Sequence, residues 1–300
     1  MPRRSYEWYV ANKKPIPYWM KRDSSGQPIK DLVGNVSVLP TIKPAEIFET
    51  DEQIEKRILD RINVFESLVD DVIRGDMRGL VCSGPPGMGK SYPVEKKLHA
   101  SEAEFQIIKG HASAKGLYET LYKHSDDGSI LVLDDADSIF GDEKALNLLK
   151  AALDTTEERV LSWITGSAFG EAVGDDERSI PTRFVFNGTL IFITNLDFDA
   201  MIEKGNRVAK HLEAIMDRTP YVNLAIRSRR DCLIRVKQVI RDTNMLGMLG
   251  IEGRKDVVTF LEDNVSKLRE LSLRTALKVA MFRKSNSNWQ DIAKVTCCKD

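Results

Sequence analysis

The fold is decided by the stretch Gly84-Pro85-Pro86-Gly87-Met88-Gly89-Lys90-Ser91, which follows the apolar run Gly79-Leu80-Val81-Cys82. This order predicts a phosphate-binding loop between a buried strand and a helix. The glycines let the backbone bring its N–H groups against phosphate oxygens, and the positive end of the following helix points at the same anion. Lys90 would reach the β- and γ-phosphates, and the Ser91 hydroxyl would complete a Mg²⁺ shell. We therefore expect residues 84–91 and the adjoining Tyr92 to bind ATP.

A second apolar run predicts the acidic partners of this loop. Residues 130–133 (Ile-Leu-Val-Leu) are typical of a strand buried on both faces, and Asp134 and Asp135 follow directly. Open α/β sheets bind ligands at the carboxyl ends of their strands. Asp134 is therefore expected to hold Mg²⁺ through water, and Asp135 to orient and polarise the attacking water.

A third run, residues 189–194, ends at Asn195. If this strand lies between the two that contact the nucleotide, Asn195 stands beside the γ-phosphate and the attacking water. With this residue the chain resembles the AAA+ ATPases, because GPPGMGKS matches the Walker A motif of the family, LVLDDAD its Walker B motif and FITN its sensor 1.

The resemblance implies two further functional arginines. In the family an arginine near the end of the helix after sensor 1 reaches the nucleotide of the neighbouring subunit. Here residues 209–217 match that helix, so Arg218 is the expected finger and Arg207 the second choice. The sensor 2 arginine of the family opens a late helix of a small lid domain, and Arg274 matches that position.

One position departs from the family pattern. The residue after the Walker B aspartate is usually Glu, whereas Asp135 is one methylene shorter. The expected consequence is slow ATP hydrolysis, or a conformational switch that is tightly coupled to ATP hydrolysis.

The composition is typical of an intracellular, cytoplasmic enzyme. The 300 residues are 42% hydrophobic and 30% charged, enough for a sizeable core and for two domains. The four cysteines fit neither a disulfide framework nor a zinc site. No apolar stretch approaches the length of a membrane span, and the first residues lack the apolar core of a signal peptide.

The charges are unevenly distributed, although the net charge is −1. Residues 1–30 contain seven Lys or Arg against two Asp or Glu, and residues 229–300 contain fifteen against nine, so the middle of the chain is acidic. The basic N-terminal arm is also rich in aromatic residues and proline. It suits either stacking on nucleic-acid bases or docking on a neighbouring subunit, and aromatic anchors favour docking.

The expected fold class is α/β, a P-loop parallel sheet covered by helices, with a small all-α lid domain. Helical periodicity over 51–73 and strands alternating with helices support this fold. We expect an arm at 1–45, a nucleotide-binding core at 46–228 and a helical lid at 229–300.

Two segments bear on the substrate. The loop 109–116 follows the second strand, where family members face the central pore of a ring; it lacks an aromatic residue and offers Lys109, His111 and Lys115 instead. The insertion before sensor 1, at 160–186, has the composition of a hairpin with a Gly-rich, acidic tip over 166–181. Acidic residues at this tip argue against a phosphate contact.

These features together predict a Mg²⁺-dependent ATPase that self-associates as a ring, with a hexamer expected. Nucleic acid is the preferred substrate, in a helicase, helicase-loader or repair role. A protein-remodelling ATPase with a protein client or adaptor, and a nucleotide-gated interaction module with little turnover, remain alternatives.

Overall fold

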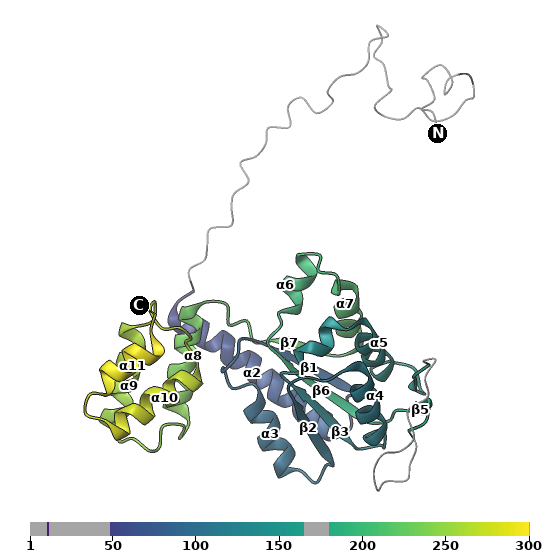
Figure 1. Cartoon of the computed structure of the whole chain (residues 1–300), viewed down its shortest axis with the longest axis horizontal. Helices are drawn as coiled ribbons and strands as arrows, with labels where there is room; N and C mark the ends of the chain where they lie inside the picture. Colours follow the sequence, from purple (N-terminus) through teal and green to yellow (C-terminus); the bar gives the residue numbers. More distant parts are fainter. Residues whose placement is uncertain (1–10, 12–48, 165–179, 300) are drawn as a thin grey trace. The chain divides into compact units, whose positions relative to one another are not determined.

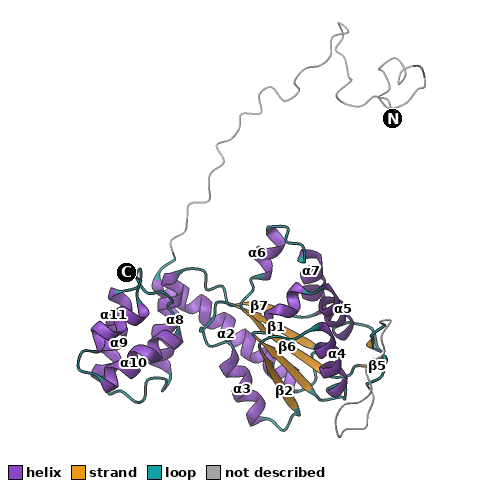
Figure 2. Ribbon diagram, in the orientation of Figure 1, coloured by secondary structure: helices purple, strands orange, loops and turns teal. Residues whose placement is uncertain are grey.

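A five-stranded parallel sheet forms the centre of the fold (Figure 1, Figure 2). The structure is a computed structural model that describes residues 49–164 and 180–299, together with Ala11. The strand order is β2-β3-β6-β1-β7. The strands are β1 (Gly79–Ser83), β2 (Phe105–Lys109), β3 (Ile130–Asp134), β6 (Thr189–Thr194) and β7 (Tyr221–Asn223). Strand β6 therefore lies between β3 and β1, as the sequence predicts, and the carboxyl ends of these three strands meet at one edge.

Helices cover both faces of the sheet. Side chains alternate along β1, so Leu80 and Cys82 join one apolar cluster while Val81 joins the other. The first cluster includes residues of α2 and α3, and the second includes residues of α4, α5 and α7. The helical elements of this part are α2 (Asp51–Ile73), α3 (Ser91–Ala100), α4 (Ala114–Lys123), the 3-10 turn η2 (Asp137–Gly141), α5 (Glu143–Ala152), α6 (Phe198–Glu203) and α7 (Ala209–Arg218). The expected fold class is confirmed.

Helix α2 has the bounds that its periodicity predicts. The Thr50 hydroxyl accepts from the Gln53 N–H, and the Gln53 side chain accepts from the Thr50 N–H, which together form a capping box. Its buried stripe faces the first apolar cluster and consists of Ile54, Ile58, Ile62, Phe65, Val69 and Val72.

The predicted insertion hairpin is present at its base. Strands β4 (Val160–Ser162) and β5 (Arg183–Val185) pair antiparallel. Tyr118 of α4 packs against Trp163 and Phe184, and its hydroxyl donates to the Pro181 carbonyl at 2.9 Å. These contacts attach the hairpin to the helix that follows the 109–113 loop. Most of the predicted tip, residues 165–179, lies outside the described residues.

From Arg229 the described chain is helical apart from turns and an isolated bridge. The helices are α8 (Arg229–Asp242), α9 (Ile251–Asp263), α10 (Leu273–Ser285) and α11 (Trp289–Cys297). Sequence periodicity predicts three of them, over 232–245, 256–267 and 273–282, and misses α11. Their apolar residues continue the first cluster, and residues 49–300 form one compact unit. The division into a core at 46–228 and a lid at 229–300 therefore stays a prediction.

Among the described residues, no helix is both long and apolar enough to cross a bilayer. The four cysteines are all free thiols, as expected. The N-terminal arm, expected over 1–45, lies outside the described residues except for Ala11.

Candidate nucleotide site

The loop after β1 takes a conformation that two of its glycines make possible. Gly87 and Gly89 have φ angles of +69° and +89°, in the left-handed region. A Cβ atom on Gly87 would lie 2.7 Å from the Cβ of Ser272, so a side chain there would collide with the start of α10. The Leu273 N–H donates to the Gly87 carbonyl at 2.9 Å. The loop is thus held against the C-terminal helices through its own backbone.

Lys90 is buried and points back across the loop. Its Nζ donates to the carbonyls of Gly84 and Pro85, at 2.7 and 2.9 Å, and to Asn195 Oδ1 at 2.8 Å. Burial lowers the pKa of Lys90, and the carboxylates of Asp134 and Asp135 oppose this shift. The site therefore holds a largely desolvated ammonium group, which suits a phosphate ligand.

Asn195 connects Lys90 to the predicted water-activating carboxylate. While its Oδ1 accepts from Lys90, its Nδ2 donates to Asp135 Oδ1 at 2.8 Å. Asp135 has a φ of +57°, and its N–H donates to the Ile193 carbonyl at 2.9 Å. The chain therefore turns sharply while it is still anchored to β6, and the carboxylate comes to lie beside Asn195.

Asp134 and Ser91 form the predicted metal-binding pair. The Ser91 hydroxyl donates to Asp134 Oδ1 at 2.9 Å, and Lys109 Nζ lies 3.4 Å from Asp134 Oδ2. One hydroxyl and one carboxylate suit Mg²⁺, which takes few protein oxygens and completes its shell with water and substrate phosphates. The described residues contain no cluster of three His, Cys, Asp or Glu side chains that could hold a metal alone. The donor set thus fits Mg²⁺ bound together with a phosphate ligand.

Asp137 has a positioning role that the sequence reasoning does not assign. Its Oδ1 accepts from the Thr194 hydroxyl at 2.6 Å, and its Oδ2 accepts from the Asn195 N–H at 3.4 Å. A carboxylate at the start of η2 therefore holds the end of β6. The only sequence signal for Asp137 is its place as the third aspartate of LVLDDAD, and the two other aspartates of that motif, Asp134 and Asp135, give the same signal.

A cavity of about 180 Å³ lies in front of the loop. Most of its lining matches the sequence prediction, including Lys90, Ser91, Asp135 and Asn195, and the 68% exposed Tyr92 lies at its wall. Arg274 of α10 also lines the cavity, which is where a sensor 2 arginine is required. Sequence reasoning does not name two apolar lining residues of the same helix, Leu273 and Leu277.

The two finger candidates lie away from this cavity. Arg218, at the end of α7, donates from Nη1 to the Ala214 carbonyl at 2.7 Å, and its buried Nε has no partner among the described residues. Arg207 is more exposed, and its Nε lies 3.8 Å from Glu143. Neither arginine lines the cavity of its own chain, and the finger role stays a prediction.

Lys109, expected to offer charge to a phosphate backbone, forms ion pairs within the chain. Its Nζ donates to Glu95 at 2.6 Å and faces Asp134, so two carboxylates already engage it. Of the three basic residues expected in the 109–116 loop, this one is not free for a phosphate backbone.

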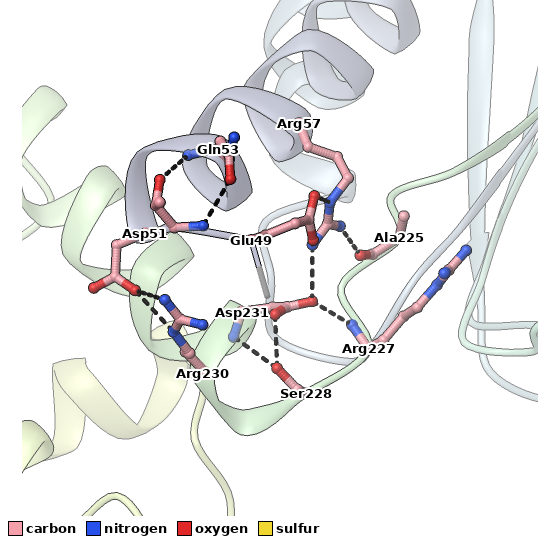
Figure 3. A network of polar contacts seen from close by, with 10 residues as sticks. Glu49, Asp51, Gln53, Arg57, Ala225, Arg227, Ser228, Arg230 and Asp231 are labelled. Atoms are coloured by element: carbon pink, nitrogen blue, oxygen red, sulfur yellow. Dashed lines mark hydrogen bonds and ion pairs between the residues drawn. The ribbon is translucent and has the colours of Figure 1, made fainter. Parts of the chain in front are cut away.

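A polar network fixes the start of α8 against α2 (Figure 3). Arg57 donates to Glu49, to the Ala225 carbonyl and to the buried Asp231. Asp231 also accepts from the Ser228 hydroxyl at 2.6 Å. Ala225 has a φ of +52°, so the connection between β7 and α8 contains a left-handed turn that Arg57 clamps.

Two ion pairs extend this contact along the helices. Arg230 donates to Asp51 at 2.8 Å near the start of both helices, and Arg241 pairs with Glu55 at 2.6 Å near the end of α8. Arg61 of α2 donates to the Asn223 carbonyl of β7 at 2.6 Å. Helix α8 is therefore positioned relative to the sheet by several independent polar contacts.

Comparison with known proteins agrees with this geometry. The profile of the ATPase family associated with various cellular activities (AAA) matches residues 80–218, a range that begins in β1 and ends at Arg218. An Enterobacteria phage T4 protein, described as an uncharacterized 36.7 kDa protein in the nrdC-mobD intergenic region, is 37% identical over 259 residues. That alignment covers 84% of this chain and 78% of the phage protein. Residues 80–218 form a domain of the AAA family.

Solved structures are similar at much lower identity. The RuvB Holliday junction branch migration motor of Thermotoga maritima is 12% identical, with a TM-score of 0.41, over 83% of this chain and 70% of that one. NtrX of Brucella abortus with ADP is 15% identical, with a TM-score of 0.43, over 76% of this chain and 52% of that one. At these values neither likeness bears on what this AAA chain acts on.

Proposed function

We propose that this AAA chain is a Mg²⁺-dependent ATPase that assembles as a ring, with six subunits, and moves or remodels nucleic acid. The observation that carries the ATPase part is the connected set of Lys90, Asn195 and Asp135 at one cavity beside the glycine loop. Asn195 is hydrogen-bonded to both Lys90 and Asp135, so a cation, a polar amide and a carboxylate lie together, which supports a constellation suited to phosphoryl transfer to water.

Each residue of the site has a separate task in this mechanism. The loop N–H groups and Lys90 hold the phosphates, and Asn195 orients the attacking water with Asp135, which accepts its proton. Ser91 and Asp134 would hold Mg²⁺, which neutralises the charge that develops on the phosphate oxygens. Arg274 approaches the same phosphates from α10. Arg218 would complete the site of a neighbouring subunit, so turnover depends on assembly.

Nucleic acid is the preferred substrate because the basic charge is concentrated at the two ends of the chain. Residues 229–300 contain fifteen Lys or Arg against nine Asp or Glu. Clusters of this sign are attracted to a phosphate backbone. A protein client is the second candidate, and the engagement of Lys109 by Glu95 and Asp134 favours it, because it removes one cation from the loop expected to face the substrate.

The steady-state ATPase rate per subunit, measured against protein concentration with and without single-stranded DNA, tests the proposal. We expect the rate to rise with concentration and to rise again with DNA, and the DNA effect to weaken with salt. Lys90→Ala is the matched control and should abolish nucleotide binding. A rate that rises with concentration but ignores DNA would favour a protein client. Retained nucleotide affinity in Lys90→Ala would contradict the assignment of the loop.

A further inference from the structure

Five buried side-chain atoms have no hydrogen-bond partner among the described residues, and two of them lie one turn apart on α8. These two are Arg235 Nε and Gln238 Nε2. Both are N–H donors, and the Gln238 side chain belongs to a residue that is only 2% exposed. Buried donors without partners are rare in folded proteins, so each needs an explanation.

The Arg235 guanidinium lies against the phosphate loop. Its Nη1 donates to Gln238 Oε1 at 2.8 Å, and its Nη2 is 3.9 Å from the position that a Cβ atom on Gly89 would take. The same position on Gly89 is 3.3 Å from Leu273, which lines the nucleotide cavity. The guanidinium of Arg235 thus lies next to the backbone of the phosphate loop, and its hydrogen bond to Gln238 holds it in this position.

The charge of Arg235 is poorly compensated. Burial lowers its pKa, and the more distant carboxylates of Glu66 and Asp242 oppose the shift. Among the described residues, no carboxylate lies within ion-pair distance of it, and its one side-chain acceptor is the neutral amide of Gln238. A buried charge without a counter-ion is unfavourable. An anion placed beside Gly89, next to Nη2 of Arg235, would offset this penalty.

We propose that Arg235 is a second nucleotide-binding arginine of the C-terminal helices and that it contacts the α- or β-phosphate. The inference deepens the proposed function, because it rests on nucleotide binding at the glycine loop. The backbone of that loop cradles the α- and β-phosphates, whereas Lys90 at its end reaches the β- and γ-phosphates. Gly89 belongs to the cradle, so Arg235 meets the part of the ligand that ATP and ADP share.

This position distinguishes Arg235 from Arg274. Arg274 lines the cavity from α10, whereas Arg235 lies beside Gly89 and should strengthen the binding of ATP and ADP alike. Because α2 holds α8 through Arg57 and Arg230, binding at Arg235 also stabilises the position of the helices against the sheet in either nucleotide state.

Calorimetric titration of the full chain with ADP and with a non-hydrolysable ATP analogue tests the proposal. In Arg235→Met we expect both dissociation constants to rise by the same factor, roughly 10- to 100-fold, as for loss of a charge-assisted hydrogen bond. The matched control is Lys237→Met, two residues away on α8, whose ammonium pairs with Glu262 at 2.6 Å and which should bind as wild type. Melting temperatures without ligand should change little in Arg235→Met, because removal of the uncompensated charge offsets loss of the hydrogen bond to Gln238 Oε1.

Three outcomes would overturn the inference. The first is unchanged affinity in Arg235→Met, and the second is a loss confined to the ATP analogue. The third is a lower melting temperature without ligand together with an unchanged ligand-induced shift, which would assign Arg235 a purely structural role. Should the methionine variant fail to fold, Arg235→Lys is the second variant, because lysine keeps the charge but lacks the planar guanidinium. It must still weaken the binding of both ADP and the ATP analogue. Failure of the wild type to bind either nucleotide would contradict the proposed function itself.

Discussion

The side-chain amide of Asn195 donates to Asp135, with 2.8 Å between Nδ2 and Oδ1, and this contact joins the ends of two neighbouring strands. It depends on an uncommon backbone conformation, since Asp135 has a φ of +57°. Aspartate tolerates this left-handed region better than most residues. An aspartate in a left-handed turn, oriented by an amide, can hold the catalytic water despite its shorter side chain.

Replacing Asp135 by Asn should give a protein that binds ATP but does not hydrolyse it. The amide cannot accept the proton of the attacking water, whereas Lys90 and the loop still bind the phosphates. General-base loss of this kind lowers turnover by roughly 10²- to 10⁴-fold. Single-turnover hydrolysis and ATP affinity, measured side by side, check both halves of this expectation. If turnover is unchanged, the catalytic role would shift to Asp137, the next acidic residue along the chain.

Asp137→Ala should lower turnover while ATP affinity is retained. The carboxylate touches Thr194 and the Asn195 backbone rather than the cavity, so its loss frees the end of β6 and misorients Asn195. Asp137→Asn keeps one acceptor oxygen for the Thr194 hydroxyl and should fall between wild type and Ala. Turnover number and KM for ATP, determined separately for the two variants, check the order. A KM effect without a turnover effect would show that the residue acts on binding instead.

Arg218→Ala should reduce turnover without weakening ATP binding to the individual subunit. Arg218 does not line the cavity of its own chain, so its proposed target is the nucleotide of a neighbour. Mixing Arg218→Ala with Asp135→Asn should restore part of the activity, because mixed assemblies contain some sites with both functional residues. Activity as a function of mixing ratio is the measurement. An absence of recovery at every ratio would remove the support for a shared site, and Arg207→Ala provides the comparison.

Asp231→Asn should destabilise the protein at neutral pH. Its free energy of unfolding should fall less on acidification than that of the wild type. Although burial alone raises the pKa of Asp231, hydrogen bonds from the Arg227 N–H, Ser228 and Arg57 lower it overall, below its ordinary 3.8. A depressed pKa stabilises the fold above the ordinary value, and this stabilisation is lost as the pH falls through the folded-state pKa. Loss of the hydrogen bonds to a charged group should cost roughly 1–3 kcal/mol at pH 7.

Urea unfolding of wild type and Asp231→Asn at pH 7 and at about pH 3 checks this sign. The free-energy difference between the two proteins should shrink at the lower pH. A difference that stays constant would mean that Asp231 acts through packing or through its neutral hydrogen bonds.

Most of the fold could be predicted because its signals are local. The run 189–194 coincides with β6, and the periodic stretch 51–73 coincides with α2. Short apolar runs specify buried strands, and the glycine spacing specifies the loop between them. The C-terminal helices differ from the prediction by a few residues. Helix α8 begins at Arg229, behind its Ser228 cap and upstream of the apolar periodicity, and α9 begins at Ile251, whereas α10 begins at the predicted Leu273. Helix α11 escapes prediction because it is short, with nine residues.

The parts of the site that could not be predicted depend on contacts between distant segments. The left-handed turn at Asp135 arises because its N–H remains bonded to Ile193 of β6, which no local pattern records. The engagement of Lys109 by Glu95 and Asp134 requires three elements to meet. Arg235 resembles any other helical arginine in the sequence, and only its place beside Gly89 distinguishes it.

The arginines that α2 directs at β7 also restrict how copies of this chain can associate. Strand β7 pairs with β1 through Pro220 and Leu224, so the Asn223 carbonyl faces away from the sheet, and Arg61 occupies it. An incoming strand would have to displace this charge-assisted bond and the one from Arg57 to Ala225. Extension of the sheet from one subunit to the next is therefore disfavoured at this edge. Any association at this edge would therefore have to rely on side chains rather than on strand pairing.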